Sequence, residues 1–494
     1  MDTEQSYYAI LDLPFDATQD EIRGAYHLAA RKFHPDTNPN LGSSDSFYNA
    51  QKAYDVLSSP SMKRDYDQTM PPEEIENPGF VIKVIQSKQK ISASKDPQLV
   101  YVLLDMGTKP VSKKAYQRPL NLTLVLDRST SMNGERMEMV KENAIRLIKQ
   151  LGKEDVISVV TFSDRAEVLI PPSRISDVHY MESKISRIQT GGSTEIFQGL
   201  SMGVSQNLQN LRPSFLNHLI LLTDGRTYGD ETNCLELAKE TANDGLGISG
   251  LGIGDDWNDK FLDELAAASG GVCMYISAPN DLRKFLEAKY RHLEQVYGEQ
   301  AVLQLSSMGR GKNQYGFRIF PEPAPLLTET PIRLGNLQIN SRLVVMAEFC
   351  LDRVDSKAKQ INVAEGYVTL QIPTRVIPRV RVPFSINCEI VPAEDIDQNM
   401  PAPIVHALSQ LTLYRMQEKA QKELENGDTV KASRHLQYLA THLLSRGEKE
   451  LANAVLKEAD HIQKSSKFSE EGDKRIKYGT RSLMLPPGLE SKES

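Results

Sequence analysis

The chain has 494 residues, of which 40% are hydrophobic and 25% charged, a composition typical of a soluble globular protein with about three domains. Its 65 acidic and 58 basic residues give a net charge of −7, which argues against nucleic acid or an anionic membrane as the main partner. No apolar run approaches the ~18 residues that a membrane helix needs.

The four cysteines are scattered, and no two of them are close in the sequence. This spacing disfavours both a zinc site and a disulfide framework, and it fits a reducing compartment. The opening residues are acidic and polar, so the sequence predicts no signal peptide. We therefore expect a cytoplasmic protein.

Short amphipathic helices are predicted in residues 5–67. Thr18 and Glu21 have the spacing of a capping box, in which the threonine side chain accepts from the backbone and the glutamate reaches back. The helix that follows carries apolar residues on one face, and a polar His-Pro-Asp loop (34–36) separates it from a second helix. Such a loop is a poor core element, but it presents fixed groups to a partner.

The stretch from residue 7 to residue 67 resembles the J-domain family over its whole length. The residues that carry the resemblance are Tyr8, Leu11, Ala17, Ile22, Ala25, Tyr26, His34, Pro35, Asp36, Phe47, Ala50, Ala53, Tyr54, Leu57, Lys63, Arg64, Asp65, Tyr66 and Asp67. In that family, the loop aspartate and the basic face of the preceding helix engage a DnaK-type chaperone and stimulate its ATPase. The resemblance therefore implies that the chaperone-binding residues are His34, Pro35, Asp36, Arg23, Arg31 and Lys32.

The sequence departs from the J-domain pattern at His27 and Leu28, two helix positions that are usually basic. Fewer positive charges weaken electrostatic steering, which mainly sets the association rate. The chain also lacks the Gly/Phe-rich segment and the Cys-x-x-Cys repeats that bind clients in general-purpose co-chaperones. Another part of the chain must therefore select the client. The alternative is that the tripeptide only shapes a turn between helices.

Strand-rich and helical patterns alternate in the rest of the chain. From Leu120 to about residue 296, apolar strands alternate with helices, which predicts a doubly wound, Rossmann-like α/β domain. Residues 300–392 resemble half of a β-sandwich, and strands within 79–107 are expected to complete it, so that the α/β domain is inserted. The predicted multidomain organisation is an all-α J-domain at 5–68, a linker at 69–78, β strands at 79–117, the α/β domain at 118–297, the β-sandwich at 298–395, a helical hairpin or bundle at 402–464 and a polar tail at 465–494.

Oxygen-bearing side chains follow the predicted strands of the α/β domain. Asp127, Ser129 and Ser131 alternate along a loop that begins where a buried strand ends, so an extended backbone aims their oxygens the same way. Thr194 follows two glycines and a serine, and Asp224 lies at the end of another strand. In a doubly wound sheet, ligand sites lie beyond the carboxyl ends of the strands. Because hydroxyl and carboxylate oxygens suit a hard cation, we expect Mg²⁺ or Mn²⁺.

The order of these residues resembles the metal-ion-dependent adhesion site of von Willebrand factor type A (VWA) domains. The resemblance covers most of the predicted α/β domain. It implies that Ser129, Ser131 and Thr194 bind the metal directly, and that Asp127 and Asp224 bind it directly or through water. An acidic side chain of a protein ligand would then complete the metal shell.

Each of these residues also has an ordinary structural explanation. Asp127 could cap the helix that begins near Gly134, and Asp224 could belong to a strand-exit turn. The serines could be solvated loop residues. Ser193 is an alternative to Thr194 as the metal-binding hydroxyl.

The sequence favours a co-chaperone or adaptor that is not an enzyme. It contains no phosphate-binding loop of the Gly-x-x-x-x-Gly-Lys-Ser/Thr type, so intrinsic NTPase activity is not expected. Such a protein would recruit and stimulate a DnaK-type chaperone and bind a protein client through its metal site, without nucleic acid or membrane as partners. The alternative is a VWA regulatory partner of an AAA-type ATPase, as in MoxR and chelatase systems, with an accessory J-domain. A third possibility is a degenerate J-domain on a signalling scaffold.

Overall fold

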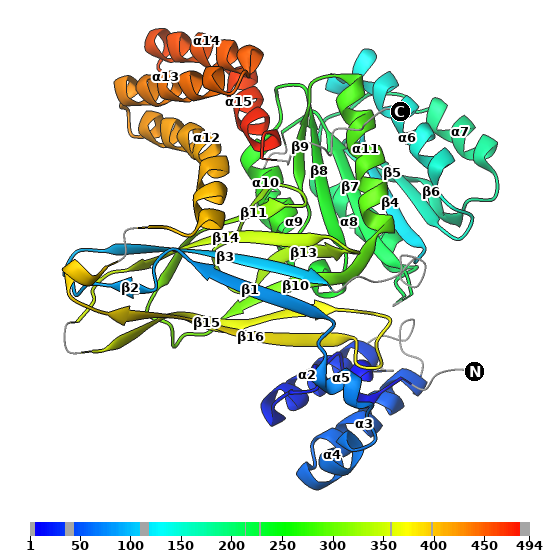
Figure 1. Ribbon diagram of the computed structural model, residues 1–494. Helices are drawn as coiled ribbons and strands as arrows, with labels where there is room; N and C mark the ends of the chain where they lie inside the picture. The colour runs from blue at the N-terminus through cyan, green and yellow to red at the C-terminus, as the bar shows by residue number, and fades with distance from the viewer. Residues whose placement is uncertain are drawn as a thin grey trace.

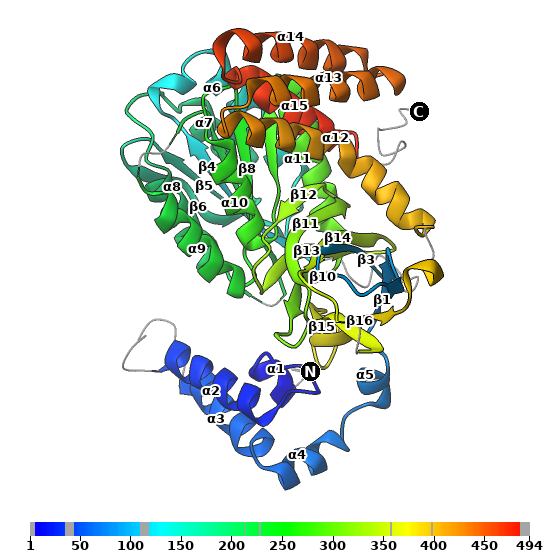
Figure 2. The same cartoon turned by 90° about the vertical axis from the view of Figure 1, so that its left-hand side faces the viewer.

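A computed structural model of the chain describes residues 5–34, 44–108, 118–212, 214–226, 229–355, 358–396 and 399–484. A long β-sandwich lies at the centre, and an α/β domain packs against it (Figure 1). One helical domain lies at the N-terminal end of the chain and another at the C-terminal end, on opposite sides of the sandwich (Figures 1 and 2). The predicted fold class is confirmed.

The N-terminal helical domain is built from short helices that bury one apolar face each. It contains α1 (Tyr7–Ile10), α2 (Gln19–Phe33), α3 (Ser44–Leu57) and α4 (Pro60–Asp67), and the linker adds α5 (Pro72–Glu76). The capping box of α2 forms as predicted, because Thr18 Oγ1 accepts from the N–H of Glu21 at 3.3 Å and Glu21 Oε2 accepts from the N–H of Thr18 at 2.8 Å. Tyr8, Ile22 and Leu57 are fully buried between the helices.

Two five-stranded sheets form the β-sandwich, in the orders β1-β3-β14-β11-β12 and β13-β10-β15-β16-β2. The strands are β1 (Phe80–Gln86), β2 (Lys90–Ile91), β3 (Gln98–Thr108), β10 (Val296–Leu305), β11 (Lys312–Phe320), β12 (Ala324–Leu326), β13 (Ile332–Gln338), β14 (Arg342–Leu351), β15 (Gln360–Gln371) and β16 (Arg379–Ile390). β3 and β14 pair in antiparallel register from Gly107↔Arg342 to Gln98↔Leu351. Because these strands flank the α/β domain in the sequence, that domain is inserted into the sandwich.

A six-stranded sheet in the order β6-β5-β4-β7-β8-β9 forms the α/β domain, and β6 runs antiparallel to β5. The elements are β4 (Leu120–Asp127), α6 (Glu135–Gln150), β5 (Val156–Phe162), β6 (Ala166–Arg174), α7 (Val178–Ser186), α8 (Ile196–Leu208), β7 (Leu216–Thr223), α9 (Glu231–Asn243), β8 (Gly247–Ile253), α10 (Asp259–Ser269), β9 (Cys273–Ile276) and α11 (Pro279–Glu294). Buried side chains of α6, α7 and α11 pack on one face of the sheet, and those of α8, α9 and α10 pack on the other. The chain leaves β4 toward β5 and later returns to β7 on the opposite side of β4. The carboxyl ends of β4 and β7 therefore flank the topological switch point, where such sheets bind ligands.

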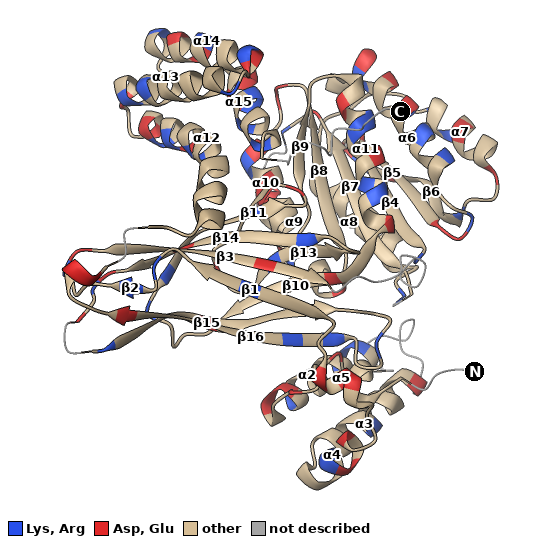
Figure 3. Ribbon diagram, viewed as in Figure 1, with Lys and Arg blue, Asp and Glu red and all other residues tan. Residues whose placement is uncertain are grey.

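The described part of the C-terminal domain contains α12 (Ala402–Glu425), α13 (Thr429–Ser445), α14 (Lys449–Ser465) and α15 (Glu470–Ser482). The prediction of a polar tail from residue 465 is wrong, because α15 packs against the α/β domain (Figure 2). Figure 3 shows the basic residues of α15 that suggested a solvated segment. Three of them, Lys474, Lys477 and Arg481, are buried instead. Arg481 donates to both carboxylate oxygens of Asp263 on α10, at 2.8 and 2.9 Å. This partner lies 218 residues away, so the local pattern does not reveal it.

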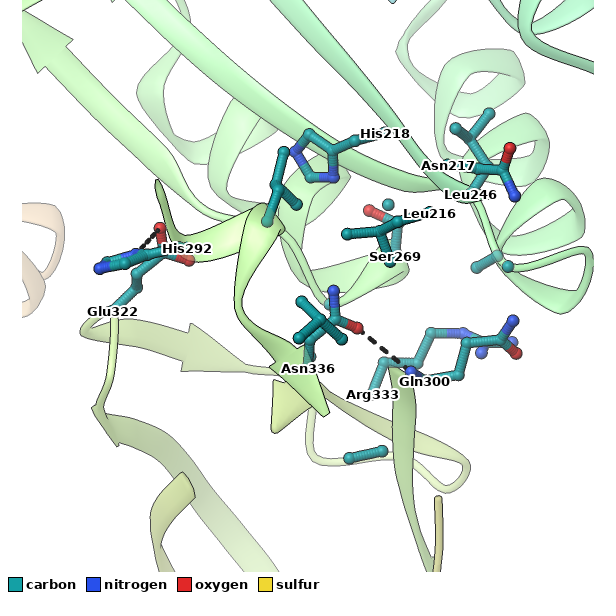
Figure 4. Close-up of a pocket in the computed structure, with 18 of the residues that line it drawn as sticks. Leu216, Asn217, His218, Leu246, Ser269, His292, Gln300, Glu322, Arg333 and Asn336 are labelled. Carbon is teal, nitrogen blue, oxygen red and sulfur yellow. Dashed lines mark hydrogen bonds and ion pairs between the residues drawn. The ribbon is translucent and has the colours of Figure 1, made fainter. Parts of the chain in front are cut away.

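Buried charges also join the α/β domain to the sandwich. Arg318 on β11 is 2% exposed, and its guanidinium donates to the carbonyls of Gly270 and Gly271, after α10, at 2.9 and 2.8 Å. Figure 4 shows the polar cavity at this junction, where His292 of α11 lies against Glu322. The cavity has a volume of about 50 Å³, so it has room for a few water molecules only. We interpret it as a small gap between two packed domains rather than a ligand site.

All four cysteines are buried free thiols. Across the described ranges, none of the helices is long and apolar enough to cross a membrane. The cytoplasmic location stays a prediction.

Asp263→Asn should destabilise the docking of α15. Burial raises the pKa of Asp263, but Arg481 and Lys477 outweigh this effect and lower the pKa to about 2. The group is therefore ionised at neutral pH, and its loss deprives two buried cations of a partner. We expect a loss of about 3–5 kcal/mol in the free energy of unfolding, measured by urea unfolding together with hydrogen exchange in α15. Asp352→Asn, at an exposed ion pair with Lys312, is the control; equal effects of the two variants would contradict the prediction.

Candidate functional site

Two carboxylates lie at the switch point of the α/β sheet. β4 and β7 pair in parallel up to Leu126↔Leu222. The residues that follow at each strand end, Asp127 and then Thr223-Asp224, therefore leave the sheet at the same edge. The side chains of both aspartates are fully buried.

Hydroxyl groups surround these two carboxylates. Ser131 Oγ donates to Asp224 Oδ1 at 2.7 Å, and the Oγ atoms of Ser129 and Ser131 are 3.1 Å apart. Thr223 Oγ1 donates to Asp127 Oδ2 at 2.6 Å, and the Ser129 N–H donates to Asp127 Oδ1 at 2.8 Å. The structure thus brings four of the five predicted site residues into one hydrogen-bonded cluster. Thr223, which no motif singled out, fixes one of its carboxylates.

Thr194 reaches this cluster from the loop before α8. A methyl group built on Gly225 would lie 2.8 Å from Thr194 Oγ1, so the threonine hydroxyl packs against the backbone beside Asp224. Ser193 points elsewhere, because its N–H and its Oγ both donate to Asp164, at 2.5 and 2.6 Å. This geometry favours Thr194 over Ser193 as the site hydroxyl.

Arg136 also belongs to the site, although no sequence motif indicates it. Its Nη1 lies 2.5 Å from Asp224 Oδ2, the oxygen that Ser131 does not bind. Gly254, after β8, leaves room for the guanidinium, since a methyl group there would lie 2.8 Å from Arg136 Nη2. The sequence position of Arg136 could have indicated this role, because side chains in the first turn of a helix point back toward the preceding loop. Arg136 neutralises part of the charge of Asp224.

The donor set fits a hard cation. Burial raises the pKa of Asp127 to about 6, although hydrogen bonds from Thr223 and Ser129 oppose the effect. Asp127 does not cap α6, whose N-cap is Gly134 without a side-chain hydrogen bond. Two carboxylates and three hydroxyls match the ligands that Mg²⁺ and Mn²⁺ prefer. Within the described ranges, this site included, no group of three His, Cys, Asp or Glu side chains gathers as a metal site, so any metal here would depend on the hydroxyls as well as the two carboxylates.

His34 lies at the C-terminal end of α2. It is the C-cap residue of this helix, and its ring packs edge-on against Phe47 of α3 with centroids 5.6 Å apart. Pro35 and Asp36, the other members of the predicted tripeptide, lie outside the described residues.

The predicted basic face of α2 is divided between solvent and another domain. Arg23 and Arg31 are exposed, and so is Leu28, at 73%. Lys32 Nζ instead lies 2.6 Å from Asp244 Oδ1 of the α/β domain. The structure therefore does not present the predicted basic residues as one free surface.

Three family models match the chain. They are the DnaJ domain at residues 6–67, the von Willebrand factor type A domain at 121–288, and the Sll0103-like, C-terminal alpha-helical domain at 402–486. The chain therefore contains a J-domain and a VWA domain, as the resemblances implied. The third match includes α15, in agreement with the structure.

Among individual proteins, the chain is similar to the uncharacterized protein sll0103 of Synechocystis sp., with 26% identity over 390 residues, 76% of this chain and 90% of that protein. It is 44% identical over 68 residues to the chaperone protein DnaJ of Dictyoglomus thermophilum, which is 14% of this chain and 17% of DnaJ. The structure of a von Willebrand factor type A protein from Catenulispora acidiphila matches 82% of this chain and 96% of its own, with a TM-score of 0.64 and 15% identity. This last likeness shows the fold. Because the chain spans under a fifth of DnaJ, co-chaperone activity is a proposal.

Gly225→Ala should weaken divalent-metal binding, because the added methyl group would displace the Thr194 hydroxyl. We expect an affinity for Mn²⁺ lower by about tenfold or more, measured by electron paramagnetic resonance of free Mn²⁺. Gly107→Ala is the control, since its added methyl would come no closer than 3.9 Å to another residue's atom. An unchanged Mn²⁺ affinity in Gly225→Ala would exclude a role for the threonine hydroxyl.

Proposed function

We propose that this chain is a co-chaperone adaptor without enzymatic activity of its own. Its J-domain recruits a DnaK-type chaperone and stimulates the chaperone ATPase, and its VWA domain binds a protein client through a metal ion. The observation that carries this proposal is the cluster of buried carboxylates and hydroxyls at the switch point of the VWA sheet, in a chain that begins with a J-domain. We propose the cytoplasm as its location.

The chaperone half of the proposal follows from the class of the N-terminal domain. A J-domain implies an Hsp70-type partner in general, and DnaK is the bacterial member of that class. The residues that would engage it are His34, Pro35, Asp36, Arg23, Arg31 and Lys32. Exposed Leu28 replaces a basic residue on α2 and offers an apolar contact instead. We therefore expect slower, less salt-dependent association than a fully basic helix would give.

The client half of the proposal follows from the donor set. Ser129, Ser131 and Thr194 would bind the metal directly, and Asp127 and Asp224 would bind it directly or through water. A Mg²⁺ or Mn²⁺ ion held by so few charged ligands remains electron-poor and accepts a carboxylate oxygen from a partner. The hydroxyls hold the carboxylates in place, and both aspartates are buried. A protein with an exposed Asp or Glu is therefore the client that we infer.

Client selection falls to the VWA domain because the chain lacks the client-binding segments of general co-chaperones. The sandwich and the C-terminal helices support that domain on two sides. No feature of the described chain favours a ring-forming ATPase as the main partner. We therefore retain the adaptor role alone.

The full chain should accelerate ATP hydrolysis by a purified DnaK-type chaperone, and His34→Gln should abolish the acceleration. Loss of the imidazole changes the end of α2, where the tripeptide begins. A steady-state ATPase assay measures the effect. His442→Gln, at an exposed position of α13, is the matched control. Hydrolysis that the wild-type chain leaves unchanged would refute the chaperone half of the proposal.

Affinity purification in Mg²⁺ should recover a protein partner that EDTA releases. Asp127→Ala should fail to recover it, because it removes one of the two buried carboxylates of the site. Quantitative mass spectrometry of the eluate measures both effects, with Asp352→Ala as the control for loss of an exposed carboxylate. Partners that persist after EDTA would show that binding does not depend on the metal.

A further inference from the structure

The J-domain is docked on the sandwich rather than held by the linker alone. Ile377, between β15 and β16, is 2% exposed and belongs to the apolar core of the J-domain. Ser6 Oγ donates to the carbonyl of Val376 at 2.6 Å. Figures 1 and 2 both show the J-domain helices beside the ends of β15 and β16. The core of the J-domain is therefore completed by another domain.

Three arginines, Arg375, Arg379 and Arg381, reinforce this contact and are called the arginine clasp below. Figure 3 shows basic residues on β16 next to acidic residues of the J-domain and linker helices. The bonds of the clasp are Arg381 Nη2 to Glu21 Oε1 at 2.6 Å, Arg379 Nε to Asp12 Oδ1 at 3.0 Å, and Arg375 Nε to Glu74 Oε2 at 3.1 Å. Glu21 is part of the capping box of α2, so the clasp fixes the start of that helix.

A fourth ion pair fixes the other end of α2. Lys32 Nζ lies 2.6 Å from Asp244 Oδ1, and Asp244 directly follows α9 of the VWA domain. Lys32 lies two residues before His34 and is one of the basic residues expected to face the chaperone. The turn of α2 that leads into the His-Pro-Asp tripeptide is thus held against the VWA domain.

We propose that this docking restrains the J-domain: Asp244 and the arginine clasp compete with the DnaK-type chaperone for α2, and full access requires release of the J-domain. A stable interface covers about 800 Å² on each partner. Since Lys32 already touches the VWA domain, a chaperone cannot cover the end of α2 while that contact persists. This inference rests on the proposed co-chaperone function and adds its regulation.

The contact is weak enough to open. The side chains of Lys32 and Asp244 are 49% and 33% exposed, and an exposed ion pair shifts an equilibrium by about fivefold at most. Salt screens such pairs further. The Lys32–Asp244 pair at the end of α2 is therefore the contact that a competing chaperone can replace first, before the more buried pairs of the arginine clasp.

Charge reversal by Asp244→Lys in the full chain tests the proposal. Spin labels at Asp55→Cys on α3 and Glu240→Cys on α9, both exposed positions, report the position of the J-domain. The ATPase rate of a purified DnaK-type chaperone reports access to α2. We expect a broader distribution of distances between the two labels. We also expect half-maximal stimulation of the chaperone ATPase at a concentration of the variant chain that is lower than that of the wild-type chain by about threefold or more. Asp352→Lys, at the exposed pair with Lys312, should change neither readout.

The outcomes separate this inference from the function on which it rests. A variant that releases the J-domain but stimulates no better than the wild-type chain overturns the restraint. Label distances that do not change overturn it as well. If neither the variant nor the wild-type chain stimulates the chaperone ATPase, the co-chaperone function itself is contradicted. Arg381→Glu, which breaks the contact with Glu21 at the other end of α2, provides an independent release and should have the same effect as Asp244→Lys.

Discussion

The antiparallel pairing of β3 with β14 is the interaction on which the other domains depend. β3 ends at Thr108 and β14 begins at Arg342, so this pairing joins a strand that precedes the inserted VWA domain to one that follows it. The chain itself leaves the VWA domain into β10, a strand of the opposite sheet. The same sheet receives α12, because Tyr414 packs in one apolar cluster with Phe317 of β11 and Leu103 of β3. The opposite sheet holds the J-domain through the β15–β16 turn. One sandwich therefore sets the relative orientation of the J-domain and the VWA domain.

Charged side chains join the domains, and their burial determines how firmly they do so. Arg318 and Arg481 are almost fully buried, and each binds groups of a neighbouring domain. Separating such groups would leave an unpaired charge in the interior, which is costly. The pairs that hold the J-domain and its linker differ in burial: Arg375–Glu74 and Arg381–Glu21 are largely buried, whereas Lys32–Asp244, at the end of α2, is more exposed and contributes little. Buried charges thus join the sandwich, the VWA domain and the C-terminal helices, whereas the contact between the end of α2 and the VWA domain is the more exposed one.

Sequence patterns predicted the features that depend on near neighbours or on sheet geometry. The capping box at Thr18 involves residues three positions apart, and the meeting of Asp127 with Asp224 follows from parallel strands that end at one edge. The patterns failed where a charge has a distant partner. Arg481 was expected in a polar tail and Lys32 on a chaperone-binding face, yet their partners lie 218 and 212 positions away. Neither hydrophobic periodicity nor motif spacing contains information about such pairs, and for that reason α15 and the docked face of α2 were not predicted.

We propose that one chain holds a chaperone and a client at the same time. Mass photometry of the full chain with a DnaK-type chaperone, ATP, Mg²⁺ and the protein recovered through the metal site measures this directly. We expect a ternary complex, which Asp127→Ala reduces to the chain and chaperone alone while Mg²⁺ remains present for ATP. If the chaperone and the client exclude each other on the chain, or if Asp127→Ala leaves the ternary complex intact, the claim is wrong.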